Sequence, residues 1–126
     1  MKYLVDAHSW IEYLEGSVKG AKVNEFLTSD NEILVMPITI SEVVSKTKRK
    51  DSNFELAYKV ILSNAKIIEM TPKIAKNAGL LHAEMRKKHE QFGIVDAIII
   101  ETAKSINAKI LTGDNHFKEF KEAIII

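Results

Sequence analysis

Short apolar runs alternate with longer segments of helical periodicity along the chain. The longer segments, in which apolar residues recur every three or four positions, span 7–15, 18–29, 39–50, 53–64, 71–89 and 94–107. The short runs are of a length that suits strands buried on both faces, and they lie at 2–5, 33–35, 66–69, 109–112 and 123–126. This alternation predicts an α/β fold in which helices cover both faces of a parallel sheet.

Local signals mark several helix boundaries. Gly16 is a plausible stop for the helix over 7–15. Thr71 and Pro72 suit the N-cap and the first position of the helix that follows them. The helix over 94–107 is nearly all apolar at its start, so we expect it to be buried. No repeat, low-complexity tract or Pro/Gly-rich linker divides the chain, and residues 1–126 are expected to form one domain.

Composition narrows the class of protein. The chain has 126 residues, of which 46% are hydrophobic and 28% charged, as in ordinary globular domains. Its formal net charge of +1 gives no strongly basic footprint, so any contact with nucleic acid must depend on local basic patches or on metal ions. The absence of cysteine excludes disulfides and thiolate metal sites. The start "MKYLVDA" does not resemble a secretory signal and no apolar run could span a membrane, so we expect a cytoplasmic protein.

Four carboxylates lie at the junctions of apolar segments. Asp6 follows the first predicted strand, and Asp114 follows the strand at 109–112. Asp96 lies near the start of the apolar helix, and Glu42 lies within "ITISEVV". Because ligands of open α/β sheets bind at the carboxyl ends of the strands, Asp6 and Asp114 are expected at that edge.

Each of these acids also has a purely structural explanation. Asp6 could cap the helix after it, and Glu42 could form a capping box with Thr39. Asp114 could stabilise a turn, and Asp96 the positive end of its own helix. These explanations do not account for the set, since clustered buried carboxylates cost several kcal/mol each unless they are paired or bound to metal. An oxygen-ligated Mg²⁺ or Mn²⁺ is the predicted partner, and zinc is disfavoured because no histidine pair has ligand spacing.

Four motifs taken in order, "LVDAHSWIEY", "ISEVV", "GIVDAIIIETA" and "ILTGDNHF", resemble those of the PIN-domain ribonucleases, especially the VapC-type toxins of toxin–antitoxin pairs. The resemblance covers essentially the whole chain. It implies a three-layer α/β/α fold with about five parallel strands in the order 3-2-1-4-5. It also implies that four acids hold Mg²⁺ or Mn²⁺ and are the catalytic residues: Asp6, Glu42, Asp96 and Asp114.

The resemblance further implies an RNA substrate, a cognate antitoxin and a homodimer. Thr112 matches a hydroxyl position beside the fourth acid. His8 stands where relatives often have Thr, Ser or Asn, and His116 stands where many relatives have a further Asp. Either histidine could change the affinity for metal or the metal that is preferred, although a plain surface role would also explain both.

We therefore predict that a metal-bound water hydrolyses an RNA phosphodiester. The basic stretches "KTKRK" (46–50) and "RKKH" (86–89) could hold phosphates, or could be solvated helix ends. The candidates for positioning substrate are Ser9, Lys46, Arg49, Arg86 and Thr112. Trp10, Tyr13 and Phe92 could stack on bases, but packing in the core or at an interface is the simpler expectation.

Other functions remain open at this point. The acidic edge could hold a structural cation in a module that binds RNA or an antitoxin without turnover, and a PIN nuclease of RNA maturation would have a similar sequence. A phosphotransfer receiver or a phosphatase would need neighbouring acids or a D-x-D motif, which "VDAHS" lacks.

Overall fold

A computed structural model describes residues 1–126. Its five strands form one parallel sheet in the order β3-β2-β1-β4-β5, which confirms the order that the resemblance implied. The strands are β1 (Lys2–Val5), β2 (Glu32–Val35), β3 (Lys66–Ile67), β4 (Lys109–Thr112) and β5 (Ala123–Ile125).

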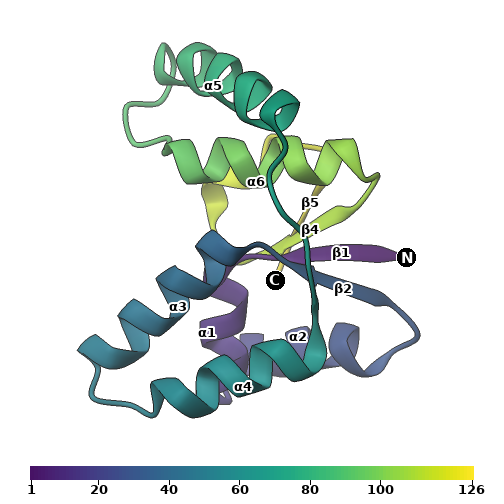
Figure 1. The fold of residues 1–126 in the computed structure, drawn as a ribbon, viewed down its shortest axis with the longest axis vertical. Helices are drawn as coiled ribbons and strands as arrows, with labels where there is room; N and C mark the ends of the chain where they lie inside the picture. The colour runs from purple at the N-terminus through teal and green to yellow at the C-terminus, as the bar shows by residue number, and fades with distance from the viewer.

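Six α-helices cover the two faces of this sheet (Figure 1). Four of them lie on one face: α1 (Ala7–Glu15), α2 (Val18–Thr28), α3 (Pro37–Arg49) and α4 (Phe54–Asn64). The helices α5 (Pro72–Arg86) and α6 (Ile94–Ser105) lie on the other, and a 3₁₀ helix, η1 (Asn115–Phe117), follows β4. The predicted three-layer α/β/α architecture is therefore confirmed.

The alternation of side chains along the strands builds two separate cores. In β1, Tyr3 and Val5 pack with α1, α3 and α4, whereas Leu4 packs with α5 and α6. Trp10 is fully buried in the first core and Phe92 is 2% exposed in the second. Both side chains therefore pack inside the protein, and neither is available to stack on a base.

Most element boundaries agree with the prediction, and two differ in an informative way. Helix α3 begins at Pro37, with Met36 as its N-cap, two residues before the predicted start. Thr39 therefore lies inside the helix, and the capping-box explanation of Glu42 is wrong. Strand β3 ends at Ile67, two residues before the predicted end. Beyond Ile67, one further hydrogen bond joins this segment to β2: Ile68 N–H donates to Val35 O at 2.9 Å.

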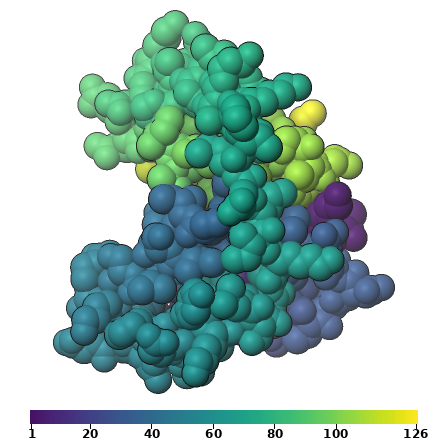
Figure 2. Space-filling view, in the orientation of Figure 1, coloured from purple at the N-terminus to yellow at the C-terminus, as the bar shows by residue number.

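The helices α1 and α2 cross closely at Gly20. A Cβ at this position would lie 2.1 Å from the backbone oxygen of Glu12, so the crossing has no room for a side chain. After α4, the chain crosses the β3 edge of the sheet to reach α5 (teal in Figure 2). None of the helices has the length and apolar character that a transmembrane passage requires.

Candidate active site

Asp6 is fixed at the carboxyl edge of the sheet by residues that follow the neighbouring strand. Strands β1 and β4 lie side by side, with Val5 opposite Leu111. The Thr112 hydroxyl donates to Asp6 Oδ2 at 2.5 Å, and the Ser9 backbone N–H donates to Asp6 Oδ1 at 2.9 Å. The Ser9 hydroxyl in turn donates to Leu111 O at 2.9 Å. Ser9 and Thr112, which were predicted to position substrate, thus both hydrogen-bond to the Asp6 carboxylate.

Asp6 is 7% exposed, and its side chain also caps the N-terminus of α1, as its structural explanation required. Burial raises the pKa of its carboxyl group above the ordinary value, while the hydrogen bonds from Thr112 and Ser9 act in the opposite direction. A carboxylate that is both buried and held by donors is oriented before any ligand arrives.

Asp114 and His116 extend the site from the other side of Thr112. The Asp114 N–H donates to the Thr112 hydroxyl at 2.9 Å, and Asp114 Oδ1 accepts from the His116 N–H at 2.9 Å, which caps η1. Asp96 lies in the first turn of α6. His116 Nδ1 is 3.5 Å from Asp114 Oδ1 and 4.0 Å from Asp96 Oδ2. The chain thus brings two acids from different elements to one imidazole.

The four carboxylates share one electrostatic neighbourhood. Burial raises the pKa of Asp96, and the charge of Asp114 raises it further. Desolvation likewise raises the pKa of Glu42, an exposed residue of α3, and the charges of Asp96 and Asp6 add to the effect. No lysine or arginine forms an ion pair with any of the four. The cluster therefore holds negative charge that the protein's own cations do not neutralise.

This donor set fits a divalent cation. One ligand atom each from Asp96, Asp114 and His116 lie within 4.8 Å of one another, and the Asp6 carboxylate is held next to them through Thr112. Carboxylate oxygens suit hard ions such as Mg²⁺ and Mn²⁺, and an imidazole nitrogen adds a somewhat softer donor. The residues present can thus hold the metal that the sequence suggested.

A groove lined by residues of α1 and α3 contains Glu42 but none of the other three acids. It has a volume of about 440 Å³, and its lining includes His8, Glu42, Lys46 and Arg49. The two cations predicted to position substrate therefore share a groove with one of the candidate metal ligands. Arg86 is exposed at the end of α5 and does not line this groove, so its predicted role has no such support.

The contact between His8 and Gly113 was not foreseen from the sequence. A Cβ at Gly113 would lie 2.3 Å from His8 Nδ1, so the imidazole packs directly against the backbone that leads to Asp114. His8 Nδ1 is buried there without a hydrogen-bond partner. The signal in the sequence was the glycine between Thr112 and Asp114, which permits this close approach.

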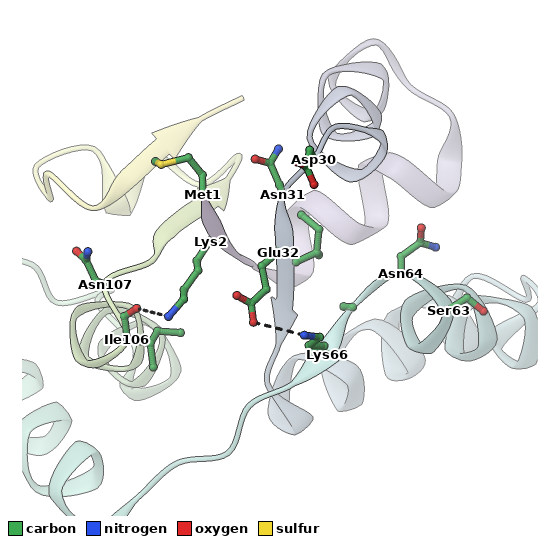
Figure 3. A pocket seen from close by; sticks show the side chains of 12 residues that line it. Met1, Lys2, Asp30, Asn31, Glu32, Ser63, Asn64, Lys66, Ile106 and Asn107 are labelled. Carbon is green, nitrogen blue, oxygen red and sulfur yellow. Dashed lines mark hydrogen bonds and ion pairs between the residues drawn. The ribbon is translucent and has the colours of Figure 1, made fainter.

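A depression of about 780 Å³ lies at the amino ends of the strands, opposite the acidic cluster (Figure 3). Lys2, Glu32 and Lys66, which begin β1, β2 and β3, contribute to its lining. The Lys2 ammonium donates to Ile106 O at 3.4 Å, and Lys66 Nζ lies 3.8 Å from Glu32 Oε1. This depression contains none of the four clustered acids, and we assign it no part in their chemistry.

Comparison with known proteins places this geometry in a family. The family model described as "PIN domain" matches residues 3–123. The chain belongs to the PIN-domain family. Over 100 residues, it is 33% identical to Ribonuclease VapC2 of Rickettsia felis, which covers 77% of this chain and 72% of the relative. The resemblance to PIN-domain ribonucleases of the VapC type is thereby confirmed.

Solved structures agree with this assignment of the fold. The complex VapBC2 from Rickettsia felis, bound to a DNA fragment from its promoter, contains a chain that matches with a TM-score of 0.76 and 25% identity, covering 100% of this PIN domain and 98% of that chain. A toxin–antitoxin complex from Klebsiella pneumoniae matches with a TM-score of 0.72 and 23% identity, covering 97% and 95%. The second likeness concerns the fold alone.

Proposed function

We propose that this PIN-domain protein is a divalent-metal-dependent endoribonuclease and the toxin of a VapBC-type toxin–antitoxin pair, with Asp6, Glu42, Asp96 and Asp114 as its catalytic and metal-binding residues. The observation that supports it most is the grouping of Asp96, Asp114 and His116, with Asp6 joined to Asp114 through the Thr112 hydroxyl. None of these acids has a lysine or arginine partner, and Glu42 is included because desolvation and the charges of Asp96 and Asp6 raise its pKa. The similarity to Ribonuclease VapC2 supports the choice of RNA as substrate.

A divalent ion at this site, Mg²⁺ or Mn²⁺, would supply a water of lowered pKa and neutralise charge on the scissile phosphate. The residues of the chain have separate tasks. Thr112 and Ser9 hold the Asp6 carboxylate in one orientation, and the η1 cap holds that of Asp114. Lys46 and Arg49 would bind phosphates next to the scissile one, because they share the groove with Glu42.

The test of this proposal is Asp96→Asn. Asparagine preserves the size of the side chain and its place in the first turn of α6, so the fold should persist. Metal-stimulated cleavage of single-stranded RNA should be lost, and thermal unfolding would verify that the variant is folded. Lys104→Gln is a suitable control, because Lys104 is an exposed residue near the other end of the same helix. Unchanged cleavage by Asp96→Asn in a clean preparation would contradict the catalytic assignment.

The same experiment separates a nuclease from a module that binds without turnover. If the wild-type protein binds RNA but cleaves none with either Mg²⁺ or Mn²⁺, the binding module is the correct reading. The expected result is cleavage that depends on the metal concentration and saturates.

An antitoxin partner and a homodimer are further parts of the proposal. The solved VapBC2 complex, in which a chain of similar fold is assembled with a partner and promoter DNA, supports the first. The neighbouring reading frames should include a small DNA-binding protein that co-purifies with this chain and suppresses its cleavage of RNA. An RNA substrate and an antitoxin partner are consistent with the cytoplasmic location expected from the sequence. Sedimentation of the purified chain would test whether it is a homodimer.

A further inference from the structure

We propose that His116 supplies a nitrogen ligand to the metal held by Asp96 and Asp114, and that this donor makes the site favour first-row transition ions such as Mn²⁺ over Mg²⁺. The inference rests on the proposed function, because it concerns the same metal site. It adds a residue to the metal shell and predicts which ion that shell selects.

The distances around the imidazole suit a shared ion. His116 Nδ1 lies 3.5 Å from Asp114 Oδ1 and 4.0 Å from Asp96 Oδ2. Donors about 2.1 Å from an octahedral ion are about 3.0 Å apart when adjacent and about 4.2 Å apart when opposite. The observed separations lie between these two values, so the side chains are close to octahedral positions and must shift by less than about 1 Å to reach them. They are also too long for direct hydrogen bonds between the ring and either carboxylate.

The imidazole is also free for this task. The only hydrogen bond of His116 to a side chain runs from its backbone N–H to Asp114 Oδ1, and its ring makes none. That backbone bond couples His116 to Asp114 within one short 3₁₀ turn. The ring is half exposed, with a side-chain exposure of 49%, so water and ions can reach it. The turn therefore presents a carboxylate and an imidazole together.

The chemistry of the donors predicts which metal is selected. Mg²⁺ favours oxygen donors and retains several waters, and it gains little from an imidazole nitrogen. Transition ions accept mixed nitrogen and oxygen shells, with affinity rising from Mn²⁺ towards Ni²⁺ and Cu²⁺. A histidine beside two aspartates should therefore raise affinity for Mn²⁺ relative to Mg²⁺.

Pulsed EPR on the full chain loaded with Mn²⁺ tests this assignment without reference to cleavage. Electron spin-echo envelope modulation should show coupling to an imidazole ¹⁴N in the wild type and none in His116→Gln. His89→Gln is the matched control, because His89 is similarly exposed, at 52%, and faces an acid, Glu119, at 3.1 Å. It should keep the nitrogen signal.

Three results would overturn the assignment: a wild-type shell made only of oxygen donors, a nitrogen signal that survives in His116→Gln, or no binding of Mn²⁺. His8→Asn should keep the signal, and its loss there would transfer the ligand role to His8. These readouts are distinct from the Asp96→Asn cleavage test, so the nuclease proposal can stand while the histidine ligand falls.

His116→Asp provides a second test. It replaces the nitrogen with a carboxylate in the same turn, so the Mn²⁺ shell becomes all-oxygen. The ratio of the Kd for Mg²⁺ to the Kd for Mn²⁺ should fall by about 10-fold, which is the lower end of the range by which residues around a metal site alter affinity. Isothermal titration with each ion measures that ratio, and an unchanged ratio would contradict the proposed selectivity.

Discussion

The Thr112 hydroxyl donates a hydrogen bond to the Asp6 carboxylate although the two residues are 106 positions apart in the chain. The same hydroxyl accepts the backbone N–H of Asp114 at 2.9 Å. One side chain thus orients the first acid of the cluster and anchors the turn that contains the last. Thr112 carries no charge, so it acts on the site only by holding Asp6 and the turn of Asp114 in place.

Thr112→Val should therefore weaken metal binding without unfolding the protein. Valine has the shape of threonine but leaves Asp6 Oδ2 without its donor and Asp114 N–H without its acceptor. We expect the affinity for Mn²⁺ to fall by about 10- to 100-fold, as for other residues that orient metal ligands. Calorimetric titration measures the change. Thr112→Ser retains the hydroxyl and should stay within a few-fold of the wild type, and equal affinities in all three proteins would contradict the positioning role.

The crowded carboxylates should make the metal-free protein less stable at neutral pH than at mildly acidic pH. In the folded state the pKa values of Asp6 and Asp96 are raised above 3.8, and that of Glu42 above 4.5. A raised pKa means that the folded state binds more protons than the unfolded state. Proton binding by these three acids therefore adds to the free energy of unfolding at low pH, and this contribution is lost as the pH rises through their pKa values in the folded state.

The comparison of wild type with Asp96→Asn isolates this effect from other titrating groups. In EDTA, the variant should gain stability relative to the wild type as the pH rises above 3.8, because it lacks a carboxylate that is costly to bury and is repelled by Asp114. At neutral pH, adding Mn²⁺ to 100 times its Kd should stabilise the wild type by about 2.7 kcal/mol. Urea unfolding across the pH range measures both effects, and a difference independent of pH would contradict the raised pKa of Asp96.

Gly113→Ala should destabilise the protein through His8. The added methyl group would lie 2.3 Å from His8 Nδ1, so the ring must swing away from the backbone it packs against. Overpacking of this kind costs about 1–3 kcal/mol. In the double variant His8→Ala/Gly113→Ala the ring is absent, and most of that cost should disappear. Urea unfolding of the wild type, the two single variants and the double variant completes this double-mutant cycle. Strictly additive losses in the free energy of unfolding would show that His8 and Gly113 do not interact.

Gly20→Ala should cost more than Gly113→Ala, because its added methyl would meet backbone and not a movable side chain. The contact is 2.1 Å to Glu12 O, where α1 and α2 cross. We expect a loss of about 3 kcal/mol, at the upper end of the overpacking range. Gly79→Ala is the control, since nothing lies within 4 Å of the added methyl in α5. It should stabilise the helix by about 0.5–1 kcal/mol, and a comparable loss there would contradict the argument.

The sequence was enough to predict each helix and strand, because the spacing of apolar residues along the chain is regular. The ends of β1, β4 and α1 were placed correctly, since polar residues or glycine bound each of them. The start of α3 was placed too late, because Pro37 opens the helix behind Met36, whose side chain forms no cap. Such a start leaves no polar signature in the sequence.

The candidate acids could be selected from the sequence, but their arrangement in space could not. Parallel pairing of β1 with β4 made it reasonable to expect Asp6 and Asp114 at one edge. The approach of His116 to Asp96 depends on how η1 and the start of α6 pack, which is a tertiary contact. The His8–Gly113 contact is of the same kind. Spacing along the chain cannot reveal either.

The placement of β4 beside β1 has a consequence for biosynthesis. Translation delivers Asp6 early and Thr112, Asp114 and His116 some hundred residues later, so a ribosome must make most of the chain before the acidic cluster can exist. A nascent fragment that ends before β4 would have Asp6, Glu42 and Asp96 but no partner strand to gather them. The metal site that we propose can therefore form only when synthesis of the chain is almost finished.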